Sequence, residues 1–191
     1  MLLKKLTLNN YANFENAEFN LWDETKPSRK VTIFIGENGA GKSNILDAIA
    51  TLMSWFVARL RSEKGSGSPI NERKIRENTS YSSIELCINS DQKDYIWNLV
   101  KLKKGHRTSI ESNLKDISEI TNIFSTIYTK SNETSSLPLF AYYNAERNLQ
   151  GYSIKNTPQK QVKPIDGYSE NISSGVDFSQ FFNWFYDLDN I

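Results

Sequence analysis

Apolar residues recur along the first part of the chain with the spacing of strands. In residues 2–8 and again in 19–21, apolar and polar positions alternate, which is typical of strands with one buried face. We expect two strands joined through residues 11–16, with residues 23–28 as a turn that contains a proline. Residues 31–35 read Val-Thr-Ile-Phe-Ile, a nearly continuous apolar run that predicts a strand covered on both faces.

A different spacing, of three to four residues, predicts helices. The clearest covers residues 43–61, whose last turn carries two arginines, a common signal at a helix C-terminus. Residues 116–130 show the same spacing and predict a second helix. Between the two helices, residues 84–88 and 95–102 read as a pair of strands that turns at residues 89–91.

The remaining segments are two stretches rich in turn-forming residues and two apolar or aromatic stretches. Residues 62–80 contain Gly-Ser-Gly-Ser-Pro and predict a flexible surface insertion. Residues 137–143 form an apolar run that opens at a proline and predict another buried strand. Residues 148–175 are polar and rich in Gly, Pro, Ser and Asn, so we expect a loop or a disordered stretch there, and the aromatic residues of 176–191 predict a helix.

The amino-acid composition is that of a soluble globular domain, and it leaves the predicted helices and strands unchanged. Hydrophobic residues make up 38% and charged residues 24%, as in a soluble globular domain, and the formal charge of +1 creates no global field that favours nucleic acid or a membrane. Residues 101–107 form a short basic run, which we interpret as a solvated strand end, with a contact to a phosphate backbone as the alternative.

The single cysteine and histidine restrict the candidate chemistry. Cys87 lies in an apolar run and predicts a buried structural thiol; with one cysteine an internal disulfide is excluded. His106 is the one histidine, so a Cys/His metal site cannot be assembled. The N-terminal residues do not form a signal peptide and no run reaches the length of a membrane span, so we expect a cytoplasmic protein without a membrane partner.

Residues 36–43, Gly-Glu-Asn-Gly-Ala-Gly-Lys-Ser, form the motif that carries chemistry. Its glycines permit a tight turn whose successive N–H groups point into one concave nest, and the helix that follows adds unpaired amides and the positive end of its dipole. Lys42 supplies a mobile charge for β- and γ-phosphates, Ser43 a hydroxyl for Mg²⁺, and Asn44 a further phosphate contact.

A hydrophobic strand before this P-loop and an amphipathic helix after it are the expected context. The sequence therefore predicts a site for ATP with Mg²⁺. The residues predicted to bind the nucleotide are Gly36, Asn38, Gly39, Ala40, Gly41, Lys42, Ser43 and Asn44.

Hydrolysis also needs a carboxylate at a strand end to hold Mg²⁺ and a group that orients water. The nearest match, residues 181–187, has helical spacing, is interrupted by Asn183, and has no Glu after Asp187, so we reject it as a catalytic strand. We interpret Ser-Ser-Gly at 173–175 as coil rather than as a signature loop. No catalytic residue is assigned, and the chain reads as the first part of an ATPase.

Two stretches resemble a known group of proteins. Residues 6–14 and 34–49 are similar to the opening strand and the P-loop of ABC-type ATPases of the SMC/RecF group. The closer resemblance, through residues 139–147 and 177–185, is to the PtuA-like ATPases of Septu and retron anti-phage systems.

This resemblance implies an α/β fold, a P-loop NTPase with an ABC-ATPase-like head lobe. The lobe has a mixed sheet plus an antiparallel β subdomain, which we expect in residues 1–147, and the start of a helical lobe follows at 176–191. In such ATPases two heads sandwich ATP, each supplying its P-loop and its partner's signature loop, so the resemblance implies a homodimer.

The resemblance also implies contacts that the motif alone does not. A Gln that links Mg²⁺ to the helical lobe is expected after residues 137–143, where the candidates are Glu146, Arg147 and Gln150, with Gln150 as the candidate metal contact. Many relatives carry a basic residue near position 13, where this chain has Asn13.

Three functions agree with these features. The first is an ATPase subunit of an anti-phage defence complex, whose nucleotide state controls a nucleic-acid clamp or a partner such as an HNH-type nuclease or a retron reverse transcriptase with its non-coding RNA. The second is a structural module that binds ATP without hydrolysing it, and the third is a DNA-repair ATPase of the RecF type.

Overall fold

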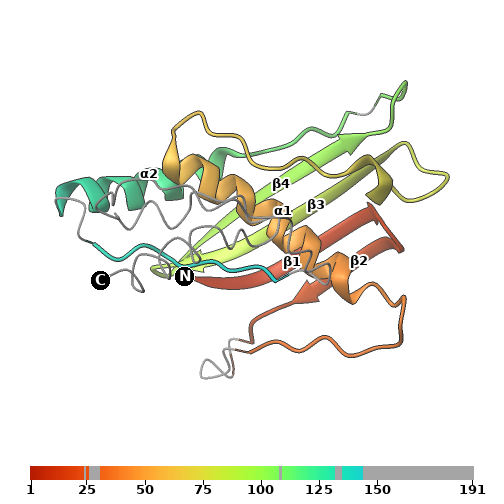
Figure 1. Ribbon diagram of the computed structural model, residues 1–191, viewed down its shortest axis with the longest axis horizontal. Coiled ribbons are helices and arrows are strands. Elements are labelled where there is room, and N and C mark those ends of the chain that lie inside the picture. The colour runs from red at the N-terminus through yellow and green to blue at the C-terminus, as the bar shows by residue number, and fades with distance from the viewer. Residues whose placement is uncertain (24, 26–30, 108, 132–134, 144–191) are drawn as a thin grey trace, which may run out of the picture.

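The fold was analysed in a computed structural model, which describes residues 1–23, 25, 31–107, 109–131 and 135–143 (Figure 1). Its sheet has four strands in the order β2-β1-β3-β4, and each neighbouring pair is antiparallel. The strands are β1 (Leu2–Tyr11), β2 (Phe14–Asn20), β3 (Tyr81–Ser90) and β4 (Lys93–Leu102). The antiparallel part of the predicted fold is therefore confirmed.

Two helices lie on one face of this sheet (Figure 1). Helix α1 (Lys42–Arg61) runs across β3 and β4, and helix α2 (Lys115–Lys130) packs against α1 and β4. A short 3₁₀ helix, η1 (Glu72–Lys74), lies between α1 and β3 in the sequence. Both predicted helices are confirmed, because each pattern places an apolar stripe toward the sheet.

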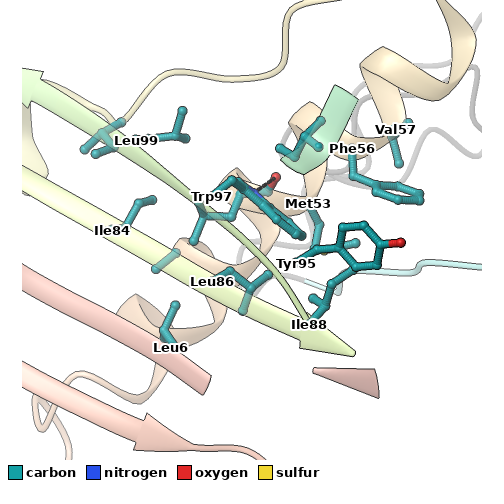
Figure 2. Packing of buried hydrophobic residues seen from close by; sticks show 14 of the residues in the cluster. Leu6, Met53, Phe56, Val57, Ile84, Leu86, Ile88, Tyr95, Trp97 and Leu99 are labelled. Atoms are coloured by element: carbon teal, nitrogen blue, oxygen red, sulfur yellow. Dashed lines mark hydrogen bonds between the residues drawn. The ribbon is translucent and has the colours of Figure 1, made fainter. Parts of the chain in front are cut away.

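The core lies between α1 and the sheet, with α2 closing one end (Figure 2). Trp97 of β4 is 1% exposed, and its indole Nε1–H donates to the Leu52 carbonyl of α1 at 3.2 Å, so its one polar atom is satisfied. The other fully buried side chains of the sheet and of α1 include Leu6, Leu8, Leu52, Phe56, Ile84, Leu86 and Ile88.

The predicted hairpin over β3 and β4 is confirmed, with its turn one residue later than expected. Asp91 and Gln92 occupy the turn with φ of 50° and 65°, the left-handed conformation that two-residue hairpin loops require. Cys87, on β3, is buried as predicted, and burial raises the pKa of its thiol. The thiol is therefore structural rather than reactive.

The predicted strand at 31–35 is wrong. The segment is extended but joins no strand ladder among the described residues, and Val31, Ile33 and Ile35 are 77%, 74% and 92% exposed. Thr32 donates to the Leu21 carbonyl at 2.8 Å. An apolar run predicts burial only when other strands cover it, and the sequence pattern does not show whether they do.

The buried strand predicted over residues 137–143 is also wrong. It too joins no ladder in the described part of the chain; Leu139 and Tyr143 are 86% and 68% exposed, whereas Phe140 packs edge-to-face on Phe56 of α1. Consequently the mixed sheet is not formed by the described residues, in which every strand pairing is antiparallel.

Residues 62–80 are anchored to the core rather than lying wholly at the surface. Ile70 is 3% exposed, and the indole Nε1–H of Trp55 on α1 donates to the Ser68 carbonyl at 2.9 Å. The expectation of a surface insertion therefore fails for its middle. A composition rich in Gly and Ser predicts a loop, but it does not show that one apolar side chain in the loop is buried.

Several predictions fall on residues that the structure does not describe. They are most of the turn at 23–28, the loop at 148–175, the helix at 176–191, and Glu146, Arg147 and Gln150. In the described portion, no helix is long and apolar enough to cross a bilayer.

Candidate functional site

Residues 36–40 form an exposed turn in front of α1, as the glycine pattern predicts. The Ala40 N–H donates to the Glu37 carbonyl at 3.2 Å, which closes the turn. Gly39 and Gly41 have φ of 85° and 97°, a backbone conformation that side chains disfavour. An added Cβ at Gly41 would lie 2.6 Å from the ends of the Asn13 and Phe14 side chains, so these side chains would have to shift, and the positive φ favours glycine independently of space.

The N-terminus of α1 is open toward this turn. Gly41 is its N-cap and offers no side-chain cap, and the first helical hydrogen bond runs from the Ile45 N–H to the Gly41 carbonyl at 3.0 Å. The amides of Lys42, Ser43 and Asn44 therefore have no acceptor within the helix. Unpaired amides and the positive end of a 20-residue helix make this place favourable for an anion.

Lys42 lies over the beginning of the turn. Its Nζ donates to the carbonyls of Gly36 and Glu37 at 2.8 and 2.7 Å, so the ammonium is held beside the open amides while one N–H remains for another acceptor. The Ser43 side chain is exposed on the same first helical turn. The structure thus places both predicted side chains, a cation and a hydroxyl, at the mouth of one concave turn.

The connection between β1 and β2, residues 12 and 13, forms the β1–β2 tip, which contacts the turn through hydrogen bonds. The Asn13 Nδ2 donates to the Ala40 carbonyl at 3.1 Å, and its Oδ1 accepts from the Asn44 Nδ2 at 3.3 Å. Asn13 therefore contacts the loop through two hydrogen bonds. The phosphate contact of Asn44 stays a prediction, since its side chain is engaged with Asn13 and Lys74.

A half-buried ion pair lies next to this tip, one helical turn after Ser43. Lys74 Nζ contacts Asp47 Oδ2 at 2.8 Å and Asn44 Oδ1 at 2.5 Å, while the Tyr142 hydroxyl donates to Asp47 Oδ1. The Lys74 carbonyl also accepts from the Ala12 N–H at 2.6 Å, which fastens η1 to the tip. The cluster therefore joins α1, η1, the β1–β2 tip and the segment 137–143.

Both tyrosines near Asp47 stay protonated. Burial is the main cause that raises the pKa of the Tyr11 phenol, and the charge of Asp47 and the neighbouring Tyr142 add to it. The pKa of Tyr142 is raised by burial first, then by its hydrogen bond to Asp47 and by the charge of that carboxylate. Tyr142 is thus a hydrogen-bond donor to Asp47 throughout the physiological range.

Sequence reasoning assigned no role to Asp47, Lys74 or Tyr142. Asp47 is four residues after Ser43, a spacing that puts two side chains on one helix face. This spacing could have indicated that Asp47 lies near the P-loop. Lys74 gave no signal, because it lies in a segment expected to be flexible. Among the described residues, no group of three or more His, Cys, Asp or Glu side chains is placed to hold a metal.

The family follows from comparison with known proteins. A family model described as an AAA domain matches residues 5–183, most of the 191 residues. The chain belongs to the AAA domain family. Its P-loop turn at residues 36–43 lies within the matched region.

Individual relatives of this AAA-domain chain are named as ATPases or repair proteins. It is 31% identical to the Retron Ec83 probable ATPase of Escherichia coli over 95% of this chain and 34% of the relative. It is 26% identical to the Retron Vc95 probable ATPase of Vibrio cholerae over 98% of this chain and 38% of the relative. The DNA replication and repair protein RecF of Phocaeicola vulgatus is 29% identical over 64% of this chain and 29% of the relative. The chain thus spans about a third of the length of the curated relatives it matches.

Proposed function

We propose that this chain binds ATP with Mg²⁺ at residues 36–44 and that the whole protein hydrolyses ATP as a subunit of a retron-type anti-phage system. The observation that carries the proposal is the uncapped N-terminus of α1 behind the turn of Gly39 and Gly41, with Lys42 across its mouth. The amides of Lys42, Ser43 and Asn44 have no acceptor within the helix, so they are available to an anion that lies in front of it.

Different groups of residues 36–44 contact different parts of the nucleotide in this proposal. The amides of the turn and of the first helical turn bind phosphate oxygens, Lys42 neutralises charge on the β- and γ-phosphates, and Ser43 would hold Mg²⁺ by its hydroxyl. When bound, the ion neutralises the charge that develops on the phosphates during transfer. Asn13 keeps the Ala40 carbonyl turned toward the β1–β2 tip, so the N–H of the same trans peptide, which belongs to Gly41, points the opposite way.

The assignment to a defence system rests on the relatives. Both retron ATPases align with nearly the whole chain, whereas the RecF protein aligns with 64% of it. We further propose that two heads form a homodimer around ATP and that nucleotide state controls an associated nuclease, a reverse transcriptase with its RNA, or a nucleic-acid clamp. A repair ATPase of the RecF type is the alternative among hydrolysing proteins.

A second candidate function is an ATP-binding module that does not hydrolyse ATP. It is kept as an alternative because no apolar strand that ends in a metal-binding carboxylate was recognised in the sequence. Turnover by the longest native form of the protein, measured with and without nucleic acid, distinguishes the two. Tight binding of ATP without any turnover would support the module and contradict the ATPase.

Calorimetric titration tests the binding site itself. We expect ATP to bind and AMP to bind much more weakly, because AMP lacks the phosphates that the turn contacts. Mg²⁺ should strengthen the binding of ATP, and Ser43→Ala should remove most of that gain, about tenfold in affinity, while it leaves metal-free binding nearly unchanged. Equal affinity for ATP and AMP would contradict the proposed site.

Gly41→Ala tests the packing under the turn. The new Cβ would displace the ends of the Asn13 and Phe14 side chains and break the hydrogen bond from Asn13 to the Ala40 carbonyl, so we expect ATP affinity to fall about tenfold. Gly105→Ala is the matched control, since Gly105 has a similar φ of 85° but open space around it, and it lies after β4. ATP affinity equal to wild type in Gly41→Ala would show that the close contact is unimportant.

A further inference from the structure

A continuous series of hydrogen bonds runs from the phosphate-binding turn to the extended segment 137–143. It begins at the Ala40 carbonyl, passes through Asn13 and Asn44 to Lys74, and continues through Asp47 to the Tyr142 hydroxyl. Its members come from five places in the sequence: the turn, the β1–β2 tip, α1, η1 and the segment 137–143.

The segment 137–143 lies along α1 and runs back toward the turn. Phe140 contacts Phe56, near the end of α1, at a ring-centroid distance of 5.5 Å, whereas Tyr142 contacts Asp47, near its beginning. The described part of this segment therefore ends beside the first turns of α1, on the side of the P-loop (Figure 1).

The Lys74–Asp47 ion pair, in the middle of this hydrogen-bond series, has the geometry to position Tyr142. The side chains of Lys74 and Asp47 are 29% and 32% exposed, so their attraction is only partly screened, and both make a second hydrogen bond. Asp47 accepts from Lys74 on one oxygen and from Tyr142 on the other. If either partner is lost, Asp47 is free to leave the rotamer in which it connects the two.

We propose that Asp47, Lys74 and Tyr142 are positioning residues that couple occupancy of the phosphate-binding turn to the position of the segment 137–143. This inference rests on the proposed function, since it needs a phosphate ligand in the turn. A bound triphosphate fixes the peptide at Ala40, and through Asn13 and Asn44 it orders the Lys74–Asp47 pair that holds Tyr142. Coupling of this kind is reciprocal, so an ordered Tyr142 favours nucleotide binding in turn.

Tyr142→Phe tests the coupling with the smallest change, because it removes only the hydroxyl. In the longest native form of the protein, we expect affinity for ATP to fall about three- to tenfold, because the coupling transmits part of the free energy of one hydrogen bond to a charged group. The matched control is Tyr143→Phe, since Tyr143 is the neighbouring tyrosine, 68% exposed, and should retain wild-type affinity.

Hydrogen exchange separates coupling from a general loss of stability. We expect ATP with Mg²⁺ to slow exchange of the backbone amides of residues 139–143 in the wild-type protein, and not in Lys74→Met measured at saturating ATP. Lys74→Arg should restore the slowing, because it keeps the charge that bridges Asn44 and Asp47. The melting temperature without ATP should be similar in all three proteins.

The possible results separate failure of the proposed function from failure of the coupling. Wild-type protein that fails to bind ATP overturns the proposed function and this inference together. Wild-type protein that binds ATP, while Tyr142→Phe keeps full affinity and Lys74→Met keeps the slowed exchange, overturns the coupling alone and leaves the binding site intact. If Tyr142→Phe does not fold, the Lys74 variants decide the question.

Discussion

Lys42→Ala is expected to lower the affinity for ATP by about 10- to 100-fold, the range for the loss of a charged donor to phosphate. The Lys42 ammonium contacts the carbonyls of Gly36 and Glu37 and stands beside the open amides of α1. Its removal takes away the one cation that the turn itself supplies. Calorimetric titration with ATP and Mg²⁺ measures the effect, and in the longest native form ATP turnover should fall with it.

Lys104→Ala is the matched control for Lys42→Ala. Lys104 is an exposed lysine of the basic run after β4, so its loss changes net charge equally without touching the turn. It should bind ATP as wild type does, apart from a small effect that salt screens. If both variants bind equally well, the turn does not use Lys42 for phosphate, and the proposed function loses its main support.

Phe56→Ala is expected to destabilise the fold by about 3–5 kcal/mol, the usual cost of removing a buried aromatic ring. Phe56 is fully buried on α1 and meets the rings of Phe124 in α2 and Phe140 edge-to-face at 6.0 and 5.5 Å. One substitution therefore opens a cavity where α1, α2 and the segment 137–143 meet. Urea-induced unfolding, compared at equal slope, measures the loss.

Leu46→Ala is the matched control on the same helix. Leu46 is 43% exposed, so its truncation removes little buried surface and should cost less than about 1 kcal/mol. A loss as small in Phe56→Ala as in Leu46→Ala would contradict the position of Phe56 in the core. A change in the slope of the unfolding curve would point instead to loss of two-state behaviour.

Local patterns in the sequence were sufficient for the two helices, the β3–β4 hairpin and the glycine turn before α1. In the first hairpin they located β1, whereas β2 begins at Phe14, inside the connection expected at residues 11–16. The apolar stripe of α1, the alternation in β1 and the glycines at 39 and 41 each act within a few residues, so their structural effect is visible in the sequence itself. The P-loop turn is the clearest case, because the direction of its backbone amides depends on neighbouring φ and ψ angles.

Only the tertiary structure decided what covers the remaining segments and which distant side chains meet. Val31, Ile33 and Ile35 have the composition of a buried strand, yet burial depends on partners elsewhere in the chain, and in the described residues they have none. Asp47 meets Lys74 across 27 positions and Tyr142 across 95. No periodicity spans such distances, since these contacts follow from how α1 lies on the sheet rather than from any local preference of the backbone.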